Sequence, residues 1–173
     1  MIRYNYLTMT VDYSLTTHMR KRLVQALSGT PMVAAGLTAS LSGSDPLWDR
    51  HPDPIRFSLR EIMAHLSDWD GIYLERLIQM RDRPGGTLAL YDETQLAATH
   101  GYAGTDPRQS LQKLARSRSE MVKMLTGLSD AQWEHTGVHP TQGLWSIDMH
   151  ASYILMHDGY HTRQIAEWIR LPE

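Results

Sequence analysis

The sequence predicts an all-α protein built as an antiparallel bundle of four main helices, with an extra short helix near the N-terminus. Three observations support this fold class. Apolar residues recur every three or four positions in several long segments, as on one face of a helix. Loops rich in glycine, proline and aspartate separate these segments. No segment alternates apolar and polar residues convincingly, as a half-buried strand does. Long helices joined by such loops typically pack as a bundle.

The first half of the chain predicts three helices. A short helix over about 14–27 precedes one over about 31–41, for which Thr30 and Pro31 provide an N-cap and a proline at the first helical position. The clearest helix covers 58–81, where Ser58 and Glu61 form the S-x-x-E capping pattern. Its apolar face holds Leu59, Ile62, Met63, Leu66, Tyr73, Leu74 and Leu77.

The second half predicts two more main helices. Asp106 and Pro107 open a helix that runs to about residue 126, and 129–134 forms an extra turn. The last helix begins near Ser146 and extends to about Ile169. The segments between the helices are predicted loops, at 42–54, 83–86, 100–107 and 136–143.

Length and composition fit one domain over residues 1–173, with a core large enough to be stable without disulfides. The absence of cysteine excludes disulfides, thiolate metal sites and a cysteine nucleophile. A net charge of -2 disfavours nucleic-acid binding, and the basic run at 19–22 is interpreted as a solvated helix face. No apolar run approaches the roughly 20 residues of a membrane span, and the first residues lack a signal-peptide pattern. We therefore expect a cytoplasmic protein without membrane or nucleic-acid partners.

Nine histidines make imidazole chemistry the main question. His157 and His161 form an H-x-x-x-H pair in the last predicted helix, so both rings lie on one face, about 6 Å apart. Two imidazoles so placed can bind one cation with bonds of about 2.1 Å. A second pair, His135 and His139, abuts Pro140 and is predicted to lie in a loop.

His157 and His161 belong to one stripe along the last predicted helix. The stripe consists of His150, Ile154, His157, His161, Gln164, Ile165 and Trp168. Two interpretations stay open. In the first, the histidines are core or interface groups with hydrogen-bond partners in the protein. In the second, their ring nitrogens bind a metal ion, because imidazoles without a partner are costly to bury. His150 lies about 10 Å along the helix from His157, too far to share the ion. His65, at the flank of the apolar face of the 58–81 helix, is the best candidate for a third ligand.

Two segments carry a resemblance to a known family. Residues 58–70 (S-L-R-E-I-M-A-H-L-S-D-W-D) and 157–165 (H-D-G-Y-H-T-R-Q-I) resemble the histidine motifs of the DinB/YfiT-like proteins, which are bacterial four-helix bundles. The likeness places the family's three histidines at His65, His157 and His161, with Gln164 and Ile165 completing the second motif. It spans about 30–169 and includes Thr30-Pro31, Asp106-Pro107 and Trp145.

The resemblance implies an up-down-down-up bundle with a long crossover, which residues 82–106 could supply. It also implies one divalent ion, nickel or zinc, held by the three histidines, with iron and manganese left open. Some members of the family are thiol S-transferases that use low-molecular-weight thiols, such as bacillithiol or mycothiol, and one member has been proposed to be a hydrolase. The expected partners are a small-molecule substrate, with or without such a thiol, and a second copy in a homodimer.

Three protein ligands would leave positions on the ion open, which favours catalysis over a purely structural site. Asp68, one turn after His65, and Asp158, beside His157, are the candidate catalytic bases. The alternative for Asp68 is a solvated carboxylate or one that orients a metal-bound histidine. Glu61, one turn before His65, serves as the acid of the capping pattern.

The function is therefore predicted to be that of a metal-dependent transferase or hydrolase. One rival is a zincin-type protease, because His157-Asp158-x-x-His161 is one methylene short of H-E-x-x-H. The twelve residues after His161 leave no room for the usual downstream ligand, and no strand is predicted to pair with a substrate. The other rival is a metal-stabilised binding module without catalytic activity.

Overall fold

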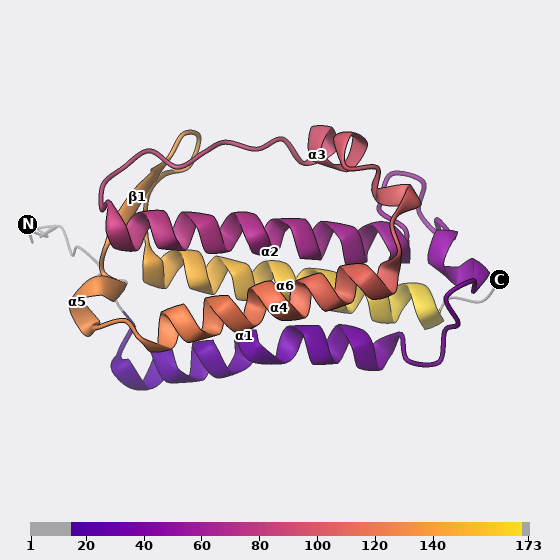
Figure 1. Ribbon diagram of the computed structural model, residues 1–173, viewed down its shortest axis with the longest axis horizontal. Coiled ribbons are helices and arrows are strands. Elements are labelled where there is room, and N and C mark those ends of the chain that lie inside the picture. The colour runs from indigo at the N-terminus through magenta and orange to yellow at the C-terminus, as the bar shows by residue number, and fades with distance from the viewer. Residues whose placement is uncertain (1–14, 171–173) are drawn as a thin grey trace, which may run out of the picture.

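The computed structural model describes residues 15–170, in which four long helices lie side by side (Figure 1). These are α1 (Thr17–Leu37), α2 (Leu59–Asp82), α4 (Pro107–Thr126) and α6 (Ile147–Arg170). The shorter elements are η1 (Pro46–Asp49), α3 (Glu93–Thr99), η2 (Tyr102–Gly104), α5 (Asp130–Trp133), β1 (Thr136–His139) and β2 (Gly143–Ser146). Over the described range, no helix is long and apolar enough to cross a bilayer.

The bundle has the predicted up-down-down-up topology. In Figure 1 the colour gradient shows that α1 and α6 run in one direction and that α2 and α4 run in the other. The contacts α1–α4, α4–α2, α2–α6 and α6–α1 close the four helices into a ring. Since α2 and α4 are parallel, residues 83–106 must travel the length of the bundle between them, and Figure 1 shows this crossover passing along α2.

The helix starts follow the predicted caps. Ser58 and Glu61 form the reciprocal capping box of α2, and Asp106 caps α4 ahead of Pro107. Each cap satisfies backbone N–H groups that have no partner inside the helix. The predicted extra turn at 129–134 corresponds to α5, which has its own capping box from Ser129.

The prediction for the first helices was wrong. Residues 14–27 and 31–41 do not form two helices, because α1 runs unbroken from Thr17 to Leu37 with Pro31 inside it. Residue 14 lies outside the described residues. Proline cannot donate to the carbonyl four residues earlier, which in this helix belongs to Leu27. That carbonyl instead accepts a hydrogen bond of 2.8 Å from Arg118 Nη1 on α4, so the helix continues through the proline.

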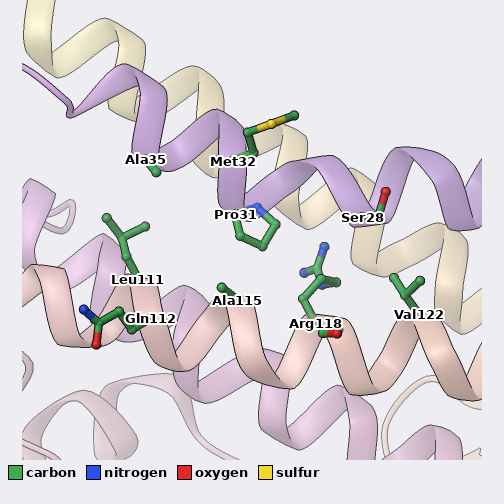
Figure 2. Close-up of a pocket in the computed structure, with 10 residues that line it drawn as sticks. Ser28, Pro31, Met32, Ala35, Leu111, Gln112, Ala115, Arg118 and Val122 are labelled. Atoms are coloured by element: carbon green, nitrogen blue, oxygen red, sulfur yellow. The ribbon is translucent and has the colours of Figure 1, made fainter.

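Arg118 is the centre of a buried polar cluster inside the bundle. Figure 2 shows its side chain reaching from α4 toward α1 beside Pro31. The groove at this place has a volume of ≈ 540 Å³, and none of the predicted metal ligands lines it. Its Nε atom bonds Asp70 at 2.7 Å, and its Nη2 atom bonds Asp158 at 3.1 Å. Thr30 Oγ1 donates to Asp158 at 2.6 Å, so the cluster ties all four long helices together.

The segment predicted as a loop at 136–143 forms most of a β-hairpin. β1 and β2 pair antiparallel, with Gly137 opposite Trp145. The apolar residue Val138 faces outward while Gly137 faces inward. The strand therefore lacks the alternation of buried apolar and exposed polar residues by which a strand is recognised in a sequence. A Cβ atom at Gly137 would stand 2.8 Å from side-chain atoms of Leu88 and Met80. Only glycine therefore lets the crossover and α2 pack so closely on this strand.

The interpretation of 19–22 as a solvated face fails for one residue. Arg20 is 5% exposed and forms a bidentate pair with Asp148 on α6 at 3.0 and 2.7 Å. Its Nη1 atom also bonds Asp130 at the start of α5. Arg20 therefore connects the first turn of α1 to the starts of α5 and α6.

Candidate metal centre

Three histidines from two helices converge between α2 and α6. His65 comes from α2, and His157 and His161 come from successive turns of α6. One nitrogen of each imidazole lies within 4.8 Å of the others, and the Nε2 atoms of His65 and His157 are 2.9 Å apart. The structure thus brings together the three residues that the sequence singled out as metal ligands.

The local sequence explains this convergence. The i, i+4 spacing puts His157 and His161 on one face of α6, which apolar neighbours such as Ile154 and Ile165 bury against the bundle. His65 follows Ile62 and Met63 on the buried side of α2, and it is 1% exposed. Burying the apolar faces of the two helices therefore brings the three imidazoles together.

Burial keeps these imidazoles neutral. Loss of water, together with the nearby His161 and His157, lowers the pKa of His65 to about 2. Burial, followed by the charge of Arg118, lowers the pKa of His157 to about 4. Burial and the neighbouring His157 lower the pKa of His161 to about 3. All three rings therefore offer lone pairs at neutral pH, as metal ligands must.

The hydrogen-bonding state of the rings fits a divalent cation. His161 Nδ1 lies 3.1 Å from the Gln164 Oε1 atom, which can only accept, so the Nδ1 proton is fixed and Nε2 keeps its lone pair. The Nδ1 atoms of His65 and His157 are buried without a partner among the described residues. The Nε2 atoms of His65 and His157 lie at hydrogen-bond distance from each other, 2.9 Å apart, and both would be available to one divalent ion.

His150 is separate from the cluster, as its spacing predicted. It is 0% exposed, and neither ring nitrogen has a hydrogen-bond partner among the described residues. Tyr73 and Trp145 pack against the ring at centroid distances of 5.4 and 5.1 Å. Burial lowers the pKa of His150 to about 3, with smaller effects from Arg76 and His139.

Aromatic rings surround the three histidines. Phe57 and Trp69 pack against His65 at 5.2 and 5.9 Å, and Tyr160 lies 4.9 Å from His161, all between ring centroids. Tyr73 and Tyr102 complete this wall. The wall keeps bulk water from most of the imidazole surface and strengthens electrostatic interactions inside the site.

A small pocket of ≈ 120 Å³ lies beside His161. Arg56 and Glu93 line it together with Ile55, Phe57, Tyr160 and Gln164. Neither Arg56 nor Glu93 belongs to a sequence motif that predicts a site. Both belong to irregular or short segments outside the main helices, where periodicity says nothing about position. Partial removal of the carboxyl group from water, with the charge of Asp92, raises the pKa of Glu93.

The two predicted bases occupy different surroundings. Asp68 binds His100 Nδ1 at 2.5 Å and Lys113 Nζ at 2.7 Å, where it holds the crossover against α2 and α4. Burial raises the pKa of Asp68, but these two hydrogen bonds outweigh burial and keep the pKa below its ordinary value. The carboxylate of Asp158 accepts hydrogen bonds from Arg118 and Thr30 in the central polar cluster. The pocket beside His161 contains neither aspartate.

Comparison with known proteins agrees with this architecture. The sequence profile of the DinB superfamily matches residues 17–165. No curated protein is significantly similar to the sequence.

Three solved structures share the fold. YfiT from Bacillus subtilis, described as a probable metal-dependent hydrolase with an unusual four-helix bundle topology, superposes with a TM-score of 0.86 at 19% identity, over 91% of this chain and 90% of its own. An uncharacterized protein from Clostridium difficile 630 gives 0.68 at 15% identity, over 89% and 97% of the two chains. A protein from Streptococcus pneumoniae gives 0.69 at 14% identity, over 89% and 92%.

Proposed function

Because this chain belongs to the DinB superfamily, whose profile covers residues 17–165, we propose that it is a metal-dependent enzyme acting on a small molecule. His65, His157 and His161 would hold one divalent ion. The observation that carries this proposal is the convergence of two buried imidazoles and one half-buried imidazole, all neutral, beside a small pocket. Among the described residues, no carboxylate joins the cluster as a fourth ligand.

When bound, a divalent ion in such a site supplies Lewis-acid activation of water or a thiol at neutral pH. The chain itself supplies orientation and proton transfer. Gln164 fixes the tautomer of His161, and the aromatic wall excludes bulk water. Glu93 is the carboxylate that lines the pocket, and its raised pKa suits a group that accepts and returns a proton.

Hydrolysis of a small molecule is the favoured reaction. The similar YfiT is described as a probable metal-dependent hydrolase, and this description supports the same class for the present chain. Transfer of an external thiol is the second candidate. It is consistent with a sequence without cysteine, because the sulfur would have to come from a separate molecule.

The proposal is tested on protein purified without a metal-affinity step. We expect about one equivalent of nickel, zinc, iron or manganese by elemental analysis, and we expect a His157→Ala, His161→Ala variant to lose it. A His135→Ala variant is the matched control, because the His135 ring bonds the Arg81 carbonyl away from the cluster. A screen of ester, amide and thiol-transfer substrates then separates the two reaction classes. A protein that takes up none of these metals on reconstitution would contradict the proposal, and metal without turnover would favour a binding module.

A further inference from the structure

We propose that the substrate of this site carries a carboxylate group, and that Arg56 binds this group at the mouth of the pocket while the reacting bond lies at the three histidines. The inference rests on the proposed metal-dependent function. It names a recognition residue and a chemical class of substrate, starting from the unused hydrogen-bonding capacity of one arginine.

The guanidinium of Arg56 is held in place by stacking. Its Cζ atom lies 4.3 Å from the ring centroid of Trp168 and 5.7 Å from that of Tyr160. Trp168 is itself fixed by a 2.9 Å hydrogen bond from Nε1 to the Phe57 carbonyl. Stacking covers the faces of the guanidinium and leaves its edge, with its N–H groups, for a planar acceptor.

The chain provides almost no acceptor for that edge. The nearest carboxylate, Glu167, lies 3.6 Å from Nη1, which is longer than a hydrogen bond, and Nε is buried without a partner among the described residues. Three other arginines of the bundle are buried, whereas Arg56 is half-buried. Arg20 and Arg118 make bidentate contacts with carboxylates, and Arg76 donates to the Ala89 carbonyl. Arg56 has the same capacity to bind a carboxylate, but the described chain supplies it only with the 3.6 Å ion pair to Glu167.

The position of Arg56 connects it with the metal centre. Arg56 and His161 line the same ≈ 120 Å³ pocket, whose size suits a small group rather than a bulky one. Glu93 is the acidic residue on this pocket, and it forms no ion pair with Arg56. A substrate carboxylate could thus bind the Arg56 guanidinium, because no carboxylate of the described chain lies within hydrogen-bond distance of it. Glu93 stays available for proton transfer.

The test uses two hydroxamates that bind a divalent metal through the same group. Succinic monohydroxamate has a carboxylate tail, and butyrohydroxamate has an uncharged tail of similar length. Dissociation constants are measured on the cobalt-loaded protein from its visible absorption. We expect the wild type to prefer the carboxylate probe by about tenfold or more, as for a charge-assisted hydrogen bond. This preference should fall to near unity in Arg56→Gln.

Two further variants make the result specific. Arg163→Gln removes an exposed positive charge from α6, two residues after His161, and it should keep the full preference. Arg56→Lys keeps the charge without the planar fork and should keep only part of the preference, so it also decides the matter if Arg56→Gln fails to fold. An unchanged preference in Arg56→Gln, with cobalt still bound, would overturn this inference alone. Failure of the wild type to bind cobalt would overturn the proposed function and this inference with it.

Discussion

A neutral imidazole binds a cation through only one of its two nitrogens, so a hydrogen bond at the other nitrogen decides which one is free. In this protein the side-chain oxygen of Gln164 occupies Nδ1 of His161. The same amide donates to the Phe57 carbonyl at 3.4 Å, which ties the orientation of His161 to the loop before α2. Gln164 is therefore a positioning residue for the metal site.

Gln164→Leu should weaken metal binding by about ten- to a hundredfold, because His161 would lose the group that fixes its tautomer. Gln164→Glu retains an acceptor and should stay close to the wild type. The measurement is the dissociation constant for zinc by competition with a chromophoric chelator. Equal affinities for the wild type and Gln164→Leu would show that packing alone orients His161.

At this scale the sequence predicted the histidines but not their surroundings. The spacing of His157 and His161 within one helix is a local property, and His65 was predicted from its place on the flank of an apolar helix face, supported by the family motif. Arg56 lies in an irregular segment, and Glu93 lies in a short helix of the crossover. Their positions depend on how these segments fold over the bundle, which no local pattern encodes.

At the scale of helices, the continuity of α1 depends on a side chain from another helix. Pro31 leaves the Leu27 carbonyl without its helical donor, and Arg118 Nη1 replaces that donor. The same guanidinium pairs with both Asp70 and Asp158. Removing it would leave two buried carboxylates without their cationic partner and one buried carbonyl without a donor.

We expect Arg118→Met to lower the free energy of unfolding by about 3–5 kcal/mol. The loss should be smaller by about 1 kcal/mol in a Pro31→Ala background, because the Ala N–H would satisfy the Leu27 carbonyl. Urea unfolding of the wild type, both single variants and the double variant gives this coupling. Pro107→Ala is the control background, since Pro107 opens α4, where the backbone N–H is not needed by the helix. Additive losses with Pro31→Ala would contradict the proposed role of Arg118.

The same contrast explains which elements could be predicted. Caps such as Ser58 and Asp106 act on the next three residues, so the starts of α2 and α4 were correct. Pro31 was interpreted by its usual local role, whereas a tertiary contact with Arg118 determines its actual one. The hairpin was missed because its inward positions at 137 and 139 are glycine and histidine, and its stability comes from the crossover and α2.

At the scale of the whole molecule, three buried histidines and the half-buried His157 make folding sensitive to acid. Burial lowers the pKa values of His65, His150, His157 and His161 to about 2, 3, 4 and 3, far below the ordinary value of 6.5. Between these values the unfolded chain binds more protons than the folded chain does. The free energy of unfolding is therefore highest above about pH 6.5, as far as these histidines determine it, and it falls as the pH decreases toward 4.

Each such histidine should contribute about 1.4 kcal/mol per pH unit to this slope, once the unfolded imidazole is mostly protonated below about pH 6. His150→Leu offers the cleanest test, because His150 is not in the metal cluster and its ring nitrogens have no partner in the described chain. We expect the variant to be at least as stable as the wild type at pH 7.5, since it removes an unsatisfied buried polar group at similar volume. Its slope between pH 6 and 4.5 should be lower by about one proton. Urea unfolding of metal-free protein at several pH values measures both effects, with the exposed His18→Gln as control. An unchanged slope in His150→Leu would mean that His150 takes up its proton in the folded state, through water that reaches the end of the bundle formed by α6 and the hairpin.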